Sequence, residues 1–146
     1  MAATVCDTSE SFYKHWTEVT LRYGDTDRQG HVNNAVYCTL YESGRTAFLF
    51  DGEHAIAGTG YSFVIVKISL DYITEMRFPG IARVGSTILQ TGRSSFTVGQ
   101  AIFKDGVCSS TSNSVIVQID DATGKSSQLT ASTLAVLTRI AHAESA

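Results

Sequence analysis

The sequence is poor in the features that mark secreted, membrane or metal-binding proteins. Its three cysteines, Cys6, Cys38 and Cys108, have no spacing typical of metal ligands, so neither a disulfide framework nor a metal site is expected. No apolar run approaches the roughly 18 residues of a membrane span, and the first residues lack the basic start and apolar run of a signal peptide. We therefore expect a cytoplasmic protein without a membrane partner.

An excess of charge of one sign is also missing. The formal net charge is −3, and the 11 Lys and Arg residues are scattered along the chain. Neutralising nucleic-acid phosphates needs a clustered basic face, so we expect no nucleic-acid partner. The 146 residues are 43% hydrophobic and 17% charged, which predicts one globular domain over residues 1–146 with flexible ends at 1–15 and 143–146.

Hydrophobic periodicity predicts an α+β fold. Period-two patterns predict strands over 17–23, 63–72, 82–91, 96–104 and 107–119. Three- and four-residue spacings predict a long helix over 34–50, stopped by Asp51-Gly52, and a short helix from Thr130 to about Ile140. Short turns such as Asp105-Gly106 favour an antiparallel sheet, and the long helix must bury its apolar stripe against one face of it.

Two details of this pattern predict how the long helix and the sheet fit together. Gly44 lies inside the helix at a cost of roughly 1 kcal/mol relative to alanine, which suggests close contact with a sheet wrapped around the helix. In the strand over 63–72, Val64, Val66, Ile68, Leu70 and Tyr72 are expected on one face, and Phe63 and Ile65 on the other.

The segment between the first strand and the long helix carries most of the chemistry. It contains two acids, Asp25 and Asp27, then His31 and the amides Asn33 and Asn34. Aspartates before helices usually form turns or caps. A helix beginning near Asn34 also offers unpaired N–H groups and the positive end of its dipole, which together can stabilise a developing oxyanion.

These residues resemble a known family signature. Arg22–Asp27 followed by Gly30–Asn34 and Tyr37 closely resembles the signature of hotdog-fold acyl-CoA thioesterases of the 4-hydroxybenzoyl-CoA thioesterase type. Glu42–Arg45 and Arg93–Ser95 resemble two further segments of that family, and the likeness covers about residues 17–140. It implies a sheet of about five strands wrapped around a long helix, with a short C-terminal helix, and an enzyme that hydrolyses acyl-CoA without a cofactor.

The resemblance assigns the catalytic residues. It makes Asp27 the catalytic carboxylate, acting as a nucleophile or as a general base, and places the carbonyl-polarising N–H at Asn34. Gly30 and Val32 belong to the same predicted active-site loop. We expect Asp25 to brace that loop, His31 to stabilise its turn and Asn33 to cap the helix.

The resemblance and the residue types also suggest where the two ends of the substrate bind. Arg93, Ser94 and Ser95 are predicted to contact the phosphates of coenzyme A, with Lys67, Arg77, Arg83 and Lys104 as competitors. Tyr37, Tyr41 and Phe63 are predicted to line the acyl pocket, although aromatic residues at helical spacing also suit a core.

Two further residues of the long helix receive a structural interpretation. Glu42 is the available candidate for the helix glutamate that other hotdog thioesterases use, but Arg45 lies at i+3, so an ion pair on the helix surface or at a subunit interface is expected. Cys38 has no histidine nearby in the sequence, so a nucleophilic cysteine is not supported.

The family also implies a homodimer or homotetramer with the active site between subunits. Two other interpretations stay open: a non-catalytic module of the same fold that binds acyl-CoA or an acyl-carrier protein, and a different small-ligand-binding α+β domain in which Asp25 and Asp27 only shape a turn. The chain carries Arg28-Gln29 where some relatives carry Pro-Ala, and no motif identifies the acyl group.

Overall fold

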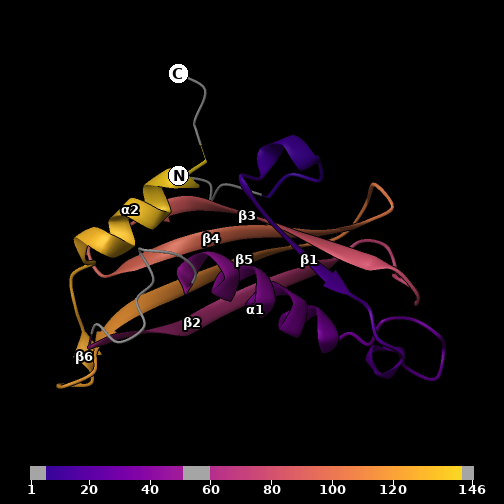
Figure 1. Ribbon diagram of the computed structural model, residues 1–146, viewed down its shortest axis with the longest axis horizontal. Helices are drawn as coiled ribbons and strands as arrows, with labels where there is room; N and C mark the ends of the chain where they lie inside the picture. The colour runs from indigo at the N-terminus through magenta and orange to yellow at the C-terminus, as the bar shows by residue number, and fades with distance from the viewer. Residues whose placement is uncertain (1–5, 51–59, 143–146) are drawn as a thin grey trace.

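A long helix lies against the concave face of a curled antiparallel sheet in the computed structural model (Figure 1). The structure describes residues 6–50 and 60–142. The strands are β1 (His15–Thr20), β2 (Tyr61–Tyr72), β3 (Ile81–Thr91), β4 (Ser95–Lys104), β5 (Val107–Asp120) and β6 (Lys125–Ser126). The helices are η1 (Glu10–Phe12), η2 (Tyr23–Asp25), α1 (Val36–Leu49) and α2 (Ala131–Arg139).

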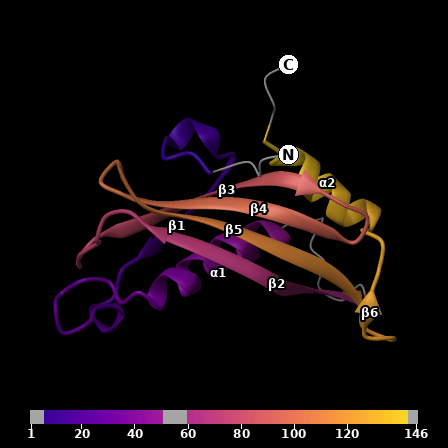
Figure 2. The same ribbon diagram turned by 180° about the vertical axis from the view of Figure 1, so that it is seen from behind.

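The sheet has the order β1-β3-β4-β5-β2, with β6 added beside β5, and all pairs are antiparallel. Seen from behind, β4 and β5 lie between β3 and β2, and α1 crosses the opposite face (Figure 2). The predicted hotdog architecture, a five-stranded sheet around one long helix with a short C-terminal helix, is confirmed. The two-residue strand β6 was not predicted, because its Lys-Ser sequence carries no strand signal.

Helix α1 packs closely on the sheet through an apolar stripe that includes Tyr37, Leu40 and Phe48. A Cβ atom on Gly44 would lie 2.7 Å from Val84 Cγ1 and 2.8 Å from Gln100 Nε2. Real Cβ atoms do not approach other atoms so closely, so only glycine fits at this position. The predicted close contact between helix and sheet is therefore confirmed.

A β-bulge changes the faces of β2. The register with β5 shifts between Ile65 and Lys67, which makes Val66 an extra residue. Phe63 packs on the core under α1 before the bulge, and Leu70 does so after it. The expected single apolar face from Val64 to Tyr72 is wrong, because one inserted residue exchanges the two faces of a strand.

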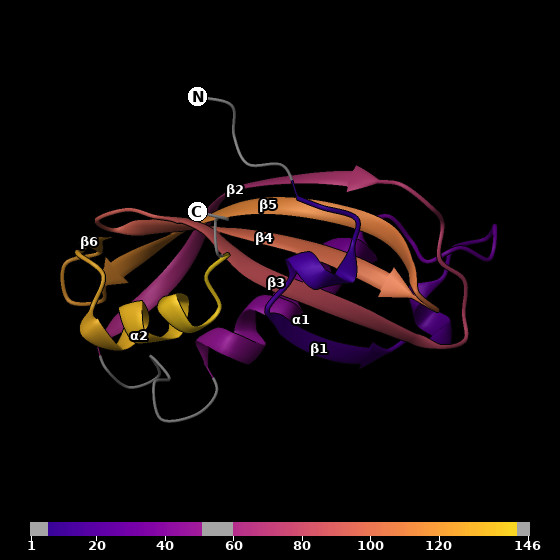
Figure 3. The ribbon, with the colours of Figure 1, turned by 90° about the horizontal axis from the view of Figure 1, so that it is seen from above.

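The N-terminal segment covers part of the other face of the sheet. Tyr13 and Cys6 are buried, and a Cβ atom on Gly85 or Gly99 would lie 2.9 Å from Tyr13 or Cys6, respectively. Cys6 and Tyr13 thus pack against the sheet, whereas residues 7–11 between them are exposed. Seen from above, η1 and α2 lie over the β3 side of the sheet, and β2 forms the far edge (Figure 3).

The two ends of the sheet carry different segments. The loop between β1 and α1 extends beyond one end, and α2 lies near the other (Figure 1). Asp105 and Gly106, with φ values of 51° and 79°, form the predicted hairpin between β4 and β5. Across the described ranges, no helix is long and apolar enough to cross a bilayer. The predicted helix stop at Asp51-Gly52 and the remaining end residues, 1–5 and 143–146, lie outside the described residues.

Candidate active site

The loop between β1 and α1 is anchored in the core at both ends. Leu21 and Val32 are 3% and 2% exposed, and both pack in the core cluster under α1. The N–H of Val32 donates to the Met76 carbonyl at 2.8 Å, and Thr26 pairs with Val32 across the loop. These contacts fix both ends of the loop, so residues 22–31 extend from the end of the sheet on anchored ends.

Asp25 braces this loop from inside. Its carboxylate accepts hydrogen bonds from the Arg22 backbone N–H at 2.8 Å and from Arg22 Nη2 and Nε at 2.8 and 3.2 Å. Its carbonyl accepts the Asn33 N–H at 2.8 Å. The hydrogen bonds from Arg22 hold the pKa of the Asp25 carboxyl below its usual range. Asp25 is buried, so its carboxylate acts as a structural acceptor.

Asp27, by contrast, is exposed, and the hydrogen bonds to its carboxylate reach only one of the two oxygens. Its Oδ1 accepts the N–H groups of Gln29 at 2.9 Å and His31 at 3.2 Å, while its own N–H donates to the His31 carbonyl at 2.8 Å. Within the described residues, Oδ2 has no hydrogen-bond partner. The loop therefore orients this carboxylate and leaves one oxygen available to react.

Asn34, just before α1, supplies a backbone donor without a partner among the described residues. Asn33 forms the turn that precedes the helix: its Oδ1 accepts the Ala35 N–H at 3.0 Å, and its carbonyl accepts the Val36 N–H at 2.9 Å. The N-cap of α1 is Ala35, without a side-chain cap, so the expected capping by Asn33 is wrong. The carbonyl of Asn34 accepts the Tyr72 hydroxyl at 3.0 Å. Among residues 6–50 and 60–142, no acceptor engages the Asn34 N–H. This N–H is the group expected to polarise a carbonyl.

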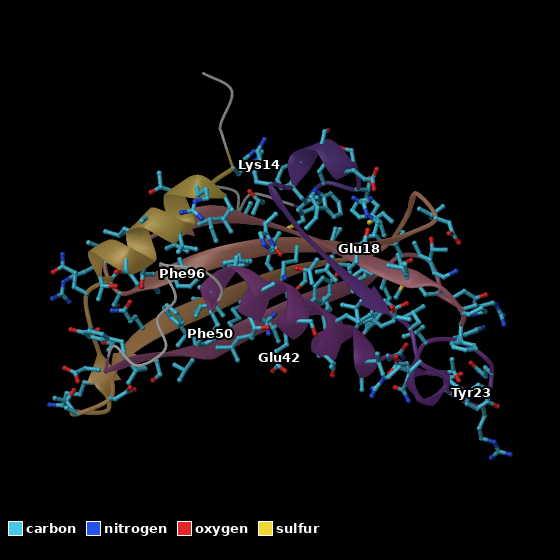
Figure 4. The ribbon with its side chains drawn as sticks, viewed as in Figure 1. Lys14, Glu18, Tyr23, Glu42, Phe50 and Phe96 are labelled. Carbon is cyan, nitrogen blue, oxygen red and sulfur yellow. The ribbon has the colours of Figure 1, made fainter. Side chains whose placement is uncertain are left out.

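A cavity of about 380 Å³ opens beside Asp27 at this end of the molecule, where Figure 4 labels Tyr23. It is lined by Tyr23, Thr26, Asp27, Arg28, Gly30, Arg77 and Phe78. The rings of Tyr23 and Phe78 meet edge to face, with centroids 5.8 Å apart. The cavity thus combines two arginines and an aromatic pair with the candidate acid, so it can contact polar and apolar parts of one ligand.

Comparison with known proteins decides the family. A family model described as the thioesterase-like superfamily matches residues 21–137. The chain belongs to the thioesterase-like superfamily. A search of curated protein sequences gave no match. The predicted enzyme class, a thioester hydrolase, is confirmed by this membership.

Solved structures support the same fold for this member of the superfamily. The PA5185 protein from Pseudomonas aeruginosa strain PAO1 is 22% identical with a TM-score of 0.83, over 92% of this chain and 96% of that one. A predicted thioesterase from Bacillus stearothermophilus is 26% identical with a TM-score of 0.79, over 87% and 96%. A thioesterase from Thermus thermophilus, complexed with coenzyme A and Zn, is 23% identical with a TM-score of 0.74, over 86% and 92%.

The residues predicted to hold the phosphates lie far from Asp27 in this thioesterase-like chain. Arg93 and Ser94 form the β3–β4 turn, where their carbonyls accept the N–H groups of Leu129 and Gln118 at 2.8 and 2.9 Å. This turn and the Asp27 loop lie at opposite ends of the 11-residue strand β3, which spans about 35 Å. Within one chain, the structure does not bring Arg93, Ser94 and Ser95 to the candidate acid.

The predicted acyl-pocket residues separate into core and cavity positions. Tyr41 is 0% exposed and its hydroxyl donates to Ser110 Oγ at 2.7 Å, so it belongs to the core and has no surface that a ligand can reach. Tyr37 is also buried, with its ring edge to face with Tyr72. Phe63 lines a cavity of about 140 Å³ between α1 and β2.

The expected ion pair between Glu42 and Arg45 is wrong. Arg45 is buried and its Nη1 donates to Gln100 Oε1 at 3.3 Å, whereas Glu42 projects from α1 into solvent (Figure 4). Arg45 turns inward because Gln100, the side chain that excludes a Cβ at Gly44, offers it an acceptor under the helix. Burial lowers the pKa of the Arg45 guanidinium, and both side chains line the cavity beside Phe63.

Two contacts to the loop were missed from the sequence. Tyr72, at the end of β2, donates to Asn34 across 38 positions of sequence. Arg77 and Glu75 contact the side chain of His31, and Arg77 lies 46 positions from it. No local pattern could reveal these contacts, because they depend on where β2 ends relative to α1.

Proposed function

We propose that the protein hydrolyses the thioester of an acyl-CoA to the free acid and coenzyme A, with Asp27 as the catalytic carboxylate. The observation that supports this most is that one loop carries both the Asp27 Oδ2 and the Asn34 N–H, neither of which has a hydrogen-bond partner among the described residues. A thioester carbonyl needs both, because an oxygen nucleophile adds to its carbon while its oxygen becomes negative.

Two routes suit this geometry. In the first, Asp27 Oδ2 attacks the carbonyl carbon, coenzyme A leaves as a thiolate, and water hydrolyses the resulting anhydride. In the second, Oδ2 removes a proton from a water molecule that attacks the same carbon, and coenzyme A again leaves as a thiolate, so that the free acid forms directly. The Asn34 N–H donates to the oxyanion in both routes, and removing such a donor typically costs about 2.7–4 kcal/mol of barrier.

Coenzyme A as the thiol component is supported by family and by a similar structure. The Thermus thermophilus thioesterase contains bound coenzyme A. The cavity beside Asp27 is lined by Arg28 and Arg77, which can donate to the polar groups of such a ligand. No cofactor is invoked, because the carboxylate and the backbone donor suffice for the hydrolysis.

We further propose that the enzyme works as a homodimer joined along β2. This strand is one edge of the sheet, opposite β1, and Val64, Val66 and Ile68 on it are 41%, 60% and 36% exposed. Antiparallel pairing of two β2 strands about a twofold axis would satisfy the open edge. It would also place the β3–β4 turn of the partner at the same end of the dimer as Asp27 of this chain. Arg93 lies in that turn of each chain, so it could then contact the phosphates of a substrate bound at the partner's Asp27.

A substrate panel tests the proposed activity. The protein is incubated with aromatic, short, branched and long-chain acyl-CoAs, and released thiol is measured. Asp27→Asn should reduce kcat on the best substrate by about 10²–10⁴-fold. The matched control is Asp120→Asn, because Asp120 Oδ1 accepts the Ala122 N–H at 2.9 Å in the same kind of turn at the other end of the sheet.

The outcomes separate the alternatives. Full activity in Asp27→Asn would remove this acid from the mechanism and leave the fold untouched. Binding of acyl-CoA without thiol release by the wild type would favour the non-catalytic binding module. Absence of both binding and turnover would favour a domain in which Asp25 and Asp27 only shape the loop.

The dimer is tested by placing a charge on the open edge. Val66→Lys should convert the dimer to a monomer in light scattering, since an edge lysine opposes strand pairing. The control is Val107→Lys, because Val107 is 52% exposed but lies at the start of β5 instead of on the open edge. A wild type that is monomeric at working concentrations would contradict the proposal.

A further inference from the structure

Three charged or titratable side chains form a cluster behind the candidate acid. His31 Nε2 lies 2.6 Å from Glu75 Oε2, and Arg77 Nη2 lies 3.2 Å from Glu75 Oε1 and 2.9 Å from His31 Nε2. Glu75 and Arg77 follow β2, whereas His31 belongs to the loop of Asp27. The family assignment gives neither Glu75 nor Arg77 a role in the reaction.

Glu75 is the centre of this cluster. His31 Nε2 and one carboxylate oxygen of Glu75 lie 2.6 Å apart, within hydrogen-bonding distance. Arg77 donates to the other carboxylate oxygen. Glu75 thus joins Arg77 to the loop histidine, and Arg77 Nη2 also lies 2.9 Å from His31 Nε2.

The backbone of His31 links the cluster around Glu75 to Asp27. His31 and Arg77 form a β-bridge, and Arg77 Nη1 lies 3.2 Å from the position of a Cβ on Gly30, so the arginine packs on the turn itself. The His31 N–H and carbonyl hold the Asp27 carboxylate and the Asp27 N–H at 3.2 and 2.8 Å. A displacement of His31 therefore displaces the carboxylate.

We propose that Glu75 is a positioning residue for thioester hydrolysis, which fixes the Asp27 carboxylate by holding His31 and Arg77. The inference rests on the proposed function of Asp27. Glu75 is not in the cavity beside Asp27, so it acts through His31 and Arg77 and not by contact with substrate. The expected signature is a loss of kcat that exceeds any rise in KM, because Arg77 also lines the cavity.

Two variants and one control test the role. Glu75→Ala should lower kcat by about 10- to 100-fold, the cost of misplacing a reacting group by a fraction of an ångström to one ångström. Its KM should rise by a smaller factor than kcat falls, because Glu75 itself does not line the cavity and only Arg77, which it holds, does. Glu75→Gln keeps one acceptor oxygen and should recover much of the lost kcat. Glu10→Ala, which breaks the surface contact of Glu10 with Arg83, should leave kcat unchanged.

A second measurement does not depend on turnover. The N–H groups of Gln29 and His31 donate to Asp27 Oδ1, so their hydrogen exchange, followed by NMR, reports the position of that carboxylate. Both amides should exchange faster in Glu75→Ala than in the wild type, while the amides of β4 keep their protection.

The outcomes are distinct. Wild-type kcat in folded Glu75→Ala, or a raised KM with unchanged kcat, would overturn the positioning role. Equal loss in Glu75→Ala and Glu75→Gln with unchanged amide exchange would overturn it as well. If the wild type hydrolyses no thioester, the proposed function fails, and the exchange of the Gln29 and His31 amides alone decides whether Glu75 positions Asp27.

Discussion

Asp25→Asn should destabilise the fold, whereas the neighbouring Asp27→Asn should not. Asp25 is buried and accepts three hydrogen bonds from Arg22. An asparagine keeps one acceptor oxygen but turns an NH₂ group toward the other donors. The bond from the backbone N–H to the buried carboxylate accounts for most of the effect, since hydrogen bonds to charged groups contribute about 1.5–3 kcal/mol.

The two guanidinium contacts add little. The Arg22 side chain is 78% exposed, so solvent screens its ion pair with Asp25 and the pair adds little to the stability of the fold. The asparagine also retains part of the hydrogen bonding. We therefore expect the free energy of unfolding to fall by about 2 kcal/mol, which lowers Tm by about 8 °C in a domain of this size.

The effect should depend on pH in a defined direction. The pKa of Asp25 is lowered in the folded state, so the charged carboxylate stabilises the fold at pH values above the ordinary aspartate pKa. That contribution disappears as the pH falls through the lowered folded pKa. The difference between wild type and Asp25→Asn should therefore be full at neutral pH and shrink in strong acid.

Chemical denaturation at several pH values measures this difference, at equal protein concentrations so that any dimer affects all samples alike. Asp27→Asn is the control, because an asparagine oxygen can still accept the Gln29 and His31 N–H groups, and its unfolding free energy should change by less than about 0.5 kcal/mol. A gap between wild type and Asp25→Asn that is absent, or that persists unchanged in strong acid, would refute the bracing role of the carboxylate.

Two further substitutions test packing and site geometry. Gly44→Ala gains about 1 kcal/mol of helix propensity. The added Cβ would overpack against the branched Val84 side chain and against Gln100, which Tyr41 and Ser86 hold in place, at a cost of about 1–3 kcal/mol. Chemical denaturation should therefore show a net loss of stability. Tyr72→Phe removes the hydroxyl that donates to the Asn34 carbonyl. We expect kcat to fall by about 2- to 10-fold, the equivalent of one hydrogen bond, with little change in Tm. An unchanged kcat would show that Asn34 is held in place without this hydrogen bond.

The sequence predicted features that rest on local patterns. Helical spacing predicted α1, and the isolated glycine predicted its closest approach to the sheet, because both depend on residues within a few positions of one another. The Asp-Gly pair predicted the β4–β5 hairpin for the same reason. The loop of Asp27 was found from its motif, since its acids and amides lie within ten positions.

Features that depend on distant contacts were missed. No glycine or proline at Val66 indicates the bulge in the sequence. Because of this bulge, both Phe63 and Leu70 face α1. The i, i+3 spacing of Glu42 and Arg45 predicted an ion pair, but Gln100, 55 positions from Arg45, offers an acceptor inside. Local spacing gives the possible partners of a side chain, and the packed neighbours determine which one it takes.

The proposals for catalysis and for the dimer depend on each other. Asp27 is exposed in the isolated chain, and a carboxylate in water stabilises a transition state poorly because solvent screens it. The loop itself is held on three sides, by Arg22 through Asp25, by Met76 and Glu75, and by Tyr72, so its geometry does not require a partner. A partner on β2 would instead supply walls that exclude water. Val66→Lys should therefore lose activity together with dimerisation while the exchange of the Gln29 and His31 amides stays as in the wild type; a fully active monomer would show that one chain encloses the substrate alone.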